Sequence, residues 1–305
     1  MRKIKLGTSS LEVPVIAVGC MRINSLEKPE AEAFVQTALE NGANFFDHAD
    51  IYGSGTCEEI FADAIHMNDD VREKIILQSK CGIRKGMFDF SKEHILNSVD
   101  GILKRLKTDY LDVLLLHRPD ALVEPEEVAE AFDVLESSGK VRHFGVSNQK
   151  PMQIQLLKKY VKQPIVANQL QLSIPNAHMI ASGVTTNMQI DQSINRDGDV
   201  LDFCRLNDIT IQPWSPFQYG YFEGPFLGNE KCPELNQKID EIAEKYGVSN
   251  TTIAIAWLLR HPANMQPVIG TMNIERLKDS VKASEVQLSR EDWYSIFQAA
   301  GYLLP

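Results

Sequence analysis

The stretch LDVLLLHR, from Leu111 to Arg118, is an apolar run that ends in two polar residues capable of chemistry. Four of its apolar residues, Val113–Leu116, are consecutive. Continuous apolar runs without alternation are typical of strands buried on both faces, as in parallel sheets covered by helices. The stretch therefore predicts a buried parallel strand with His117 and Arg118 at its carboxyl end.

Seven further runs of this kind occur along the chain, and together they predict eight strands. They are Val15–Gly19, Asn44–Phe46, Lys74–Leu77, Val141–Val146, Pro164–Ala167, Ile209–Ile211 and Pro267–Ile269. Helical patterns lie between them, and strand and helix in alternation predict parallel βαβ units. A (β/α)8 TIM barrel takes about 250 residues, so we predict one such α/β barrel domain over residues 1–305. A doubly wound open sheet is the competing architecture.

Additional elements are expected at the two ends of the barrel and within its helical layer. Ile4–Leu6 and Leu11–Val13 suit an N-terminal β-hairpin, and a C-terminal extra helix is expected beyond the barrel. Ser91 is a candidate N-cap for a helix whose apolar residues recur at helical spacing from Ile95 to Leu106. The sequence from Thr56 to Glu59 is typical of a capping box. Pro125 followed by two glutamates suits the first turn of another helix.

Composition and charge exclude several classes of protein. The net charge of −10 argues against a nucleic-acid or anionic-membrane surface, which would require clustered Lys and Arg. No run approaches 18 apolar residues, and the N-terminus lacks the apolar region of a signal peptide. The five cysteines are odd in number and widely spaced, without a zinc-like grouping. We therefore expect a cytoplasmic protein with free thiols.

The residues that follow the eight runs are nearly all polar. The runs end in Gly19-Cys20, Asp47-His48, Ser79-Lys80, His117-Arg118, Ser147-Asn148, Asn168-Gln169, Trp214-Ser215 and Gly270-Thr271. In a barrel these ends meet at one face, where active sites are built. The barrel therefore predicts that Asp47, Lys80 and His117 converge although they are far apart in the sequence.

The stretch FDHADIYG, from Phe46 to Gly53, is the most informative motif. It resembles the signature of the aldo-keto reductase family, in which an Asp and a Tyr five residues later act with a Lys and a His from later strands. QSK (Gln78–Lys80), LLHRP (Leu115–Pro119) and GKVRHFGVSN (Gly139–Asn148) follow in the family's order. The chain is most similar to the bacterial branch of broadly annotated oxidoreductases. The resemblance implies reduction of an aldehyde or ketone to an alcohol, with hydride from NADP(H) and a proton from Tyr52.

Elementary chemistry agrees with these roles. Hydride arriving at a carbonyl carbon leaves charge on the oxygen, which a positioned acid must neutralise. A free tyrosine titrates near 10, and a nearby ammonium such as that of Lys80 lowers its pKa. Asp47 is expected to hold Lys80 in a partly buried ion pair. His117 is expected to orient the carbonyl by a hydrogen bond.

No G-x-G-x-x-G follows the first strand, so a Rossmann dinucleotide site is not indicated. The resemblance instead implies a cofactor across the barrel mouth. Ser147, Asn148 and Gln169 would bind the carboxamide, Trp214 would stack on the nicotinamide, and Ser215, Pro216 and Phe217 would lie along the pyrophosphate. Gly270, Thr271 and Arg276 would hold the adenosine phosphate, and Cys20, Met21 and Arg22 would border the nicotinamide. Asn273 is a candidate N-cap for the helix that carries Arg276.

Two departures from the family pattern bear on the cofactor. Many members carry Lys where Gly270 stands and Asn where Ser280 stands. Arg276 is then the main residue that favours NADPH over NADH, because its guanidinium suits a phosphate.

Other functions remain open at this stage. Potassium-channel β subunits resemble this fold and bind NADPH mainly as partner or sensor proteins. A barrel isomerase or aldolase would use Lys80 in a Schiff base. A metal site at His48 and Asp50 lacks the required spacing. The expected partner is a small carbonyl compound. The loop Ser173–Gly198 is expected to be a functional lid or a mobile insertion. The loop Phe217–Pro233 contains Tyr219, Tyr221, Phe222 and Phe226, and is expected to line a substrate pocket or to anchor on the barrel rim.

Overall fold

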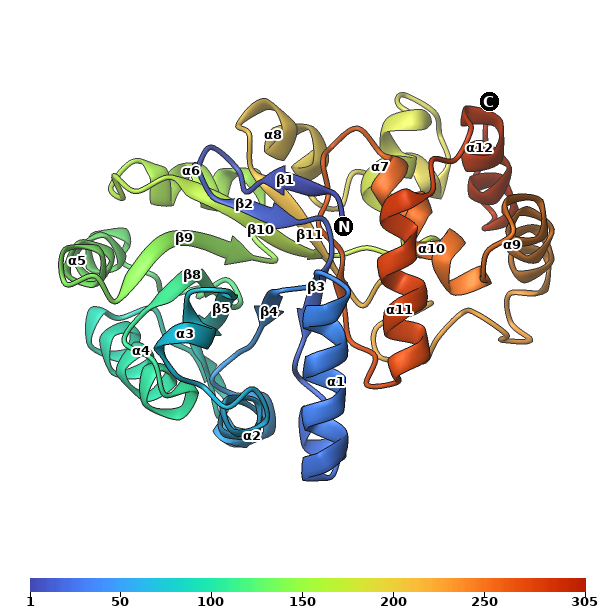
Figure 1. Ribbon diagram of the computed structural model, residues 1–305. Coiled ribbons are helices and arrows are strands. Elements are labelled where there is room, and N and C mark those ends of the chain that lie inside the picture. Colours follow the sequence, from blue (N-terminus) through green and yellow to red (C-terminus); the bar gives the residue numbers. More distant parts are fainter.

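The computed structural model describes residues 1–305 and forms a closed barrel of eight parallel strands inside a layer of helices (Figure 1). The strands are β3 (Ala17–Gly19), β4 (Phe45–Asp47), β5 (Ile76–Cys81), β8 (Leu111–Leu116), β9 (Val141–Ser147), β10 (Ile165–Gln171), β11 (Thr210–Trp214) and β12 (Val268–Ile269). Their order around the barrel is β10-β11-β12-β3-β4-β5-β8-β9, and β9 pairs with β10 to close it. The predicted barrel is confirmed, and the open sheet is wrong.

Eight longer helices account for most of the outer layer. They are α1 (Lys28–Glu40), α2 (Thr56–Ala64), α4 (Lys92–Leu106), α5 (Pro125–Ser137), α6 (Pro151–Lys158), α9 (Pro233–Tyr246), α10 (Asn250–Arg260) and α11 (Ile274–Lys282). Shorter ones are α3 (Asp69–Arg72), α7 (His178–Val184) and α8 (Val200–Leu206), and α12 (Arg290–Ala299) is the predicted C-terminal helix. None of these helices is both long and apolar enough to cross a bilayer.

Local sequence explains two of the helix starts. The Ser91 hydroxyl accepts a hydrogen bond from the His94 N–H, which confirms Ser91 as the N-cap of α4. The capping box predicted at Thr56 is wrong. Gly55, in the left-handed region at φ +96°, precedes α2, and the Thr56 hydroxyl donates to the Gly53 carbonyl instead.

Two short hairpins accompany the barrel. The predicted N-terminal one pairs β1 (Lys3–Lys5) with β2 (Glu12–Pro14), and Leu6 and Val13 pack against Phe45 and Val113 of the barrel strands. The second, β6 (Ile83–Arg84) with β7 (Met87–Phe88), was not predicted. Because the first hairpin packs on the amino-terminal part of the barrel interior, the functional side chains lie toward the carboxyl ends of the strands.

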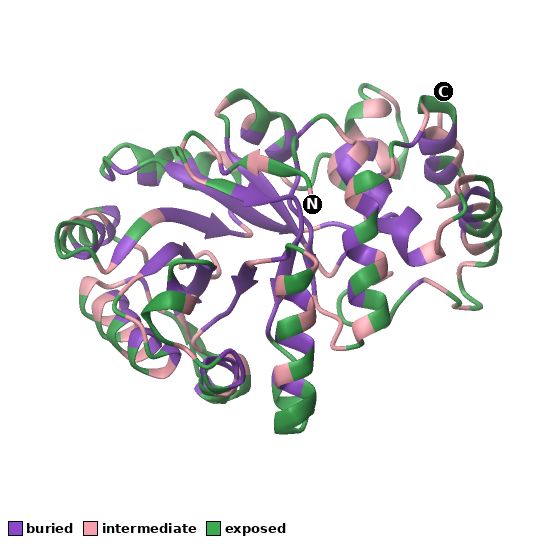
Figure 2. Cartoon of the chain, viewed as in Figure 1, coloured by how far each residue is buried: buried purple, intermediate pink, exposed green.

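The main apolar core lies between the barrel and the helices, so the strands are buried while the outer helix faces are exposed (Figure 2). Of the two loops expected to be irregular, residues 173–198 contain α7 and a 3-10 turn at Asp191–Ser193. The segment 217–233 contains no helix or strand apart from an isolated bridge between Gln218 and Pro225 and the first residue of α9.

Candidate active site

A cavity of about 700 Å³ lies at the carboxyl ends of the barrel strands. It is lined by Tyr52 and His117 and by residues that follow β3, β9, β11 and β12. The convergence predicted from the strand ends is therefore confirmed. In this arrangement one open site is bordered by residues from most of the barrel.

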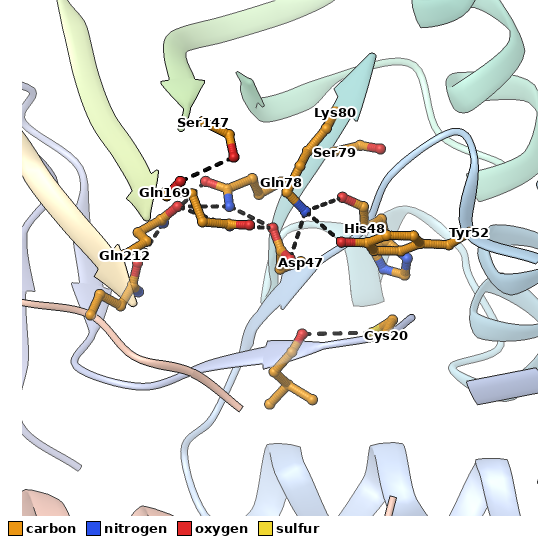
Figure 3. A network of polar contacts seen from close by, with 12 residues as sticks. Cys20, Asp47, His48, Tyr52, Gln78, Ser79, Lys80, Ser147, Gln169 and Gln212 are labelled. Carbon is orange, nitrogen blue, oxygen red and sulfur yellow. Dashed lines mark hydrogen bonds and ion pairs between the residues drawn. The ribbon is translucent and has the colours of Figure 1, made fainter. Parts of the chain in front are cut away.

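Lys80 is at the centre of the polar network beside this cavity (Figure 3). Its ammonium donates to Asp47 Oδ2 at 2.7 Å, to the His48 carbonyl at 2.7 Å and to the Tyr52 hydroxyl at 3.2 Å. All three ammonium hydrogens therefore have acceptors. The predicted ion pair is present, but Lys80 is fully buried and Asp47 is 2% exposed, so the expectation of partial burial is wrong.

Burial and the charges in this network shift the pKa values of Lys80 and Tyr52. Burial alone lowers the pKa of Lys80, but Asp47 and Tyr52 outweigh it and raise that pKa above its ordinary value. Burial is the largest influence on Tyr52 and raises its pKa, while Lys80 opposes the rise without cancelling it. Lys80 is therefore an ammonium and Tyr52 a protonated phenol at neutral pH. The predicted net lowering of the Tyr52 pKa is wrong for this structure, because the depth of burial exceeds what a strand end suggests.

Asp47 is held by amides as well as by Lys80. Gln78 and Gln169 both donate to its Oδ1, at 2.6 and 3.0 Å. Gln78 forms a reciprocal amide pair with Gln212, at 2.9 and 3.1 Å. Gln212 donates in turn to Gln266 at 2.8 Å. A buried carboxylate with three donors is fully satisfied, and its orientation toward Lys80 is fixed.

His117 borders the cavity edge-on to Tyr52, with ring centroids 6.0 Å apart. Burial, and next to it the charges of Lys80 and Arg118, lower the pKa of His117 well below its ordinary value. The imidazole is therefore neutral at physiological pH. Its Nδ1 is buried without a hydrogen-bond partner, and other atoms of the residue line the cavity.

The residues predicted to bind a carboxamide form a linked set. Ser147 donates to the Gln169 carbonyl at 3.0 Å, Asn148 donates to the Ser147 hydroxyl at 2.7 Å, and the Trp214 indole donates to Asn148 at 3.0 Å. Asn148 and Ser215 follow β9 and β11 with φ of +58° and +52°. Non-glycine residues in this left-handed region cluster at binding sites.

The end of the cavity beyond β12 contains the residues predicted to hold a phosphate. Gly270, Thr271 and Arg276 line it, as do Ser215, Pro216 and Phe217. Asn273 accepts the Arg276 N–H at 3.0 Å, so the predicted N-cap of α11 is confirmed. The Arg276 side chain has no carboxylate partner. A Cβ on Gly270 would meet nothing within 4 Å.

None of the cysteines lines the cavity. Met21 and Arg22 line the cavity, but Cys20 does not, and its thiol donates to the Val18 carbonyl at 3.7 Å. Burial raises the pKa of Cys20, Cys57 and Cys81. All three are therefore protonated thiols at neutral pH, which are poor nucleophiles.

The two loops differ in their relation to the cavity. Tyr221 and Phe222 line it, and their rings lie 6.4 and 6.0 Å from that of Trp214. The loop Phe217–Pro233 is therefore a pocket wall, one of the roles expected for it. Residues 173–198 contribute nothing to the lining. The aromatic residues of the loop 217–233, which the polar loop 173–198 lacks, are the sequence signal that distinguishes the two.

His48 and Asp50 do not form a metal centre with His117. The His48 ring packs edge-on against Phe61 of α2, with centroids 4.6 Å apart, and burial lowers its pKa to about 3. No group of three or more His, Cys, Asp or Glu side chains has metal-binding geometry.

Several lining residues were missed by the sequence reasoning. They include Ile51, Ile83, Gln218, Leu227, Asn250, Thr251 and Met272. Most lie on loops or at a helix start, where no periodic pattern marks the side that faces a cavity.

The barrel, the cavity and the buried set of Asp47, Lys80 and Tyr52 together define an oxidoreductase of the aldo-keto reductase type. A family model described as "Aldo/keto reductase family" matches residues 15–300. The chain is 34% identical to the uncharacterized oxidoreductase YcsN of Bacillus subtilis, with both chains covered in full. It is 33% identical to a 6-dehydroglucose reductase of Agrobacterium fabrum over 98% of each chain. The crystal structure of the thermostable aldo-keto reductase Tm1743 bound to the inhibitor epalrestat matches with a TM-score of 0.78 at 27% identity, over 98% of this chain and 100% of that one. The chain belongs to the aldo/keto reductase family.

Proposed function

We propose that this protein reduces an aldehyde or ketone to an alcohol with NADPH, and that Tyr52 is the proton donor. The observation that carries the proposal is the 3.2 Å contact between Lys80 and the Tyr52 hydroxyl, within a network that also orients Asp47. Tyr52 and His117 line the same cavity, so one carbonyl oxygen can reach both.

The cavity fits a nicotinamide dinucleotide in three respects. Its volume of about 700 Å³ is in the range of cofactor sites. Strained positions follow β9 and β11 at Asn148 and Ser215, where backbone and side-chain polar groups border the cavity. Arg276 offers an unpaired guanidinium at one end, as an adenosine phosphate requires. When bound, the cofactor would supply the hydride.

The roles of the chain's own residues follow from their contacts. Ser147, Asn148 and Gln169 are already linked, so they present a preorganised set of polar atoms to the carboxamide. Neutral His117 donates a hydrogen bond to the substrate oxygen and orients it. Tyr52 then transfers its proton to that oxygen, and Lys80 stabilises the phenolate that remains.

Lys80 is poorly placed for a Schiff base. Its three hydrogens are engaged, its pKa is raised by Asp47 and Tyr52 against the effect of burial, and it does not line the cavity. A nucleophilic amine would have to be neutral and accessible.

The proposal is tested by following NADPH oxidation with a panel of aldehydes and ketones, including aldehydes of polyhydroxylated compounds because of the 6-dehydroglucose reductase relative. Tyr52→Phe is the matched control, because it removes only the phenolic proton. Turnover that depends on Tyr52 supports the proposal. Tight NADPH binding with hydride transfer too slow for a catalytic cycle, measured by stopped flow, would favour a sensor protein instead.

A further inference from the structure

Arg118 is a charged residue of the cavity that none of the roles above uses. It follows β8 directly after His117 and lines the same cavity. Its guanidinium lies over the Trp214 ring, 5.5 Å from the centroid. The Arg118 charge also lowers the pKa of His117, and this effect is smaller than those of burial and Lys80. Arg118 is thus beside the reacting groups and in contact with the aromatic wall.

No carboxylate of the protein neutralises this guanidinium. Arg118 takes part in no ion pair and no hydrogen bond, although it is only partly exposed. The nearest acid in sequence, Asp120, is engaged with the N–H groups of Phe90 and Leu122 at 2.9 and 2.8 Å. A partly desolvated charge without a partner is unfavourable unless a ligand supplies the counter-charge.

The lining of the cavity as a whole has more positive than negative side chains. Asp47 is its single carboxylate and is already paired with Lys80, whereas Arg22, Arg118 and Arg276 all border the cavity. The cavity is therefore cationic in a chain whose net charge is −10.

Barrel topology separates Arg118 from the predicted phosphate end. Going round the barrel in either direction, β8 is four strands away from β12, so the two strands are opposite each other. Gly270 and Thr271 follow β12, whereas Arg118 follows β8 beside His117. The adenosine phosphate would therefore be across the barrel mouth from the end of β8, whereas the carbonyl at Tyr52 and His117 would be next to it.

We propose that Arg118 determines substrate specificity by binding a carboxylate on the carbonyl substrate. The guanidinium lies over the Trp214 ring at 5.5 Å from the centroid, and none of its N–H groups has a partner in the protein, so its donors are free for a bidentate contact. This inference rests on the proposed carbonyl reduction. It adds that the substrate class is carbonyl compounds that also carry a carboxylate.

The test compares 4-carboxybenzaldehyde with its methyl ester, methyl 4-formylbenzoate, because the two differ in charge while their carbonyls and ring are nearly alike. Wild-type protein is expected to show a kcat/KM about 10- to 100-fold higher for the carboxylate, the loss typical of a charge-assisted hydrogen bond. Arg118→Met should abolish that preference by raising KM for the carboxylate, with kcat and ester turnover nearly unchanged. Arg118→Lys should restore part of it, since it keeps the charge but not the fork. Arg290→Met, which removes an exposed arginine outside the cavity, is the matched control.

Other outcomes overturn the inference. Equal kcat/KM for acid and ester in wild-type protein would do so, and the ester turnover would still support carbonyl reduction. Equal losses for both substrates in Arg118→Met, with weaker NADPH binding by fluorescence titration, would assign Arg118 to the cofactor. If no carbonyl is reduced, carbonyl reduction itself fails, and calorimetric binding of the two probes then decides about Arg118. If wild-type protein binds the acid more tightly than the ester, and Arg118→Met removes this difference, the carboxylate site is supported. Equal binding of both probes by wild-type protein refutes it.

Discussion

Lys80→Met separates the two consequences of the buried ion pair, its contribution to stability and its effect on Tyr52. Methionine has a similar length and no charge, and the site is fully buried. The variant leaves Asp47 with its two amide donors, Gln78 and Gln169, but without a cation. It also removes the positive charge 3.2 Å from the Tyr52 hydroxyl.

The magnitudes follow from the contacts. Removing one partner of a buried ion pair costs about 3–5 kcal/mol, and the remaining amides place this case near the lower end. For a chain of this size 1 kcal/mol corresponds to about 2 °C in the melting temperature, so a fall of about 6 °C or more is expected. Burial already raises the Tyr52 pKa against the effect of Lys80. Without Lys80 the phenol is a weaker acid, and turnover should fall by about 10²–10⁴, the contribution of general acid catalysis.

Thermal unfolding and NADPH oxidation are measured on Lys80→Met and on the double variant Asp47→Asn/Lys80→Met. The double variant contains no buried charge at these two positions, so it should recover most of the lost stability and none of the turnover. A Lys80→Met protein that melts within about 1 °C of wild type and turns over within about threefold of it would refute the reasoning.

Three further outcomes are expected from single substitutions. Tyr52→Phe should lose carbonyl reduction by at least about 10²-fold while NADPH binding, followed by fluorescence titration, stays within about twofold; near-normal turnover would rule out Tyr52 as the donor. Gly270→Lys should tighten NADPH about tenfold relative to NADH, because a side chain there meets no obstacle and adds a cation near Arg276; an unchanged affinity ratio would place the phosphate elsewhere. Burial, and next to it Glu58, raise the pKa of Asp50 to about 7, so the folded protein retains a proton that the unfolded chain releases near its ordinary value of 3.8. Folding stability should therefore fall as pH rises from about 4 to about 7, and Asp50→Asn should stabilise the protein by about 2 kcal/mol at pH 8 but not at pH 4; equal gains at both pH values would contradict this linkage.

The barrel was predictable because each strand is a continuous apolar run and each run ends in polar residues. Approximate strand limits were enough to predict the barrel, although single limits were wrong. The strand β5 extends to Cys81, beyond the predicted Leu77, so Lys80 is inside the strand and not after it. Inside a strand, Gln78 and Lys80 are two residues apart and point to the same face. That spacing is the signal that would have revealed Gln78 as a partner of Asp47.

One of the wrongly predicted features depends on tertiary burial. The sign of the Tyr52 pKa shift depends on the balance between desolvation and the Lys80 charge. The sequence identifies Lys80 as a neighbour of Tyr52 but does not show how deeply Tyr52 is buried. The capping box at Thr56 failed for a local reason. Gly55, in the left-handed region, is the N-cap of α2, so Thr56 is already the first helical residue and is one position too late to cap the helix.

Net charge is informative about a surface but not about a cavity. The chain's charge of −10 argues against polyanionic partners that bind broad surfaces, because repulsion there acts over the whole face. The same chain lines its cavity with three arginines and one neutralised aspartate. Inside such a cavity nearby charges outweigh distant surface charges that salt screens. We propose on this basis that the site binds an anionic cofactor through Arg276 at one end and an anionic substrate through Arg118 at the other.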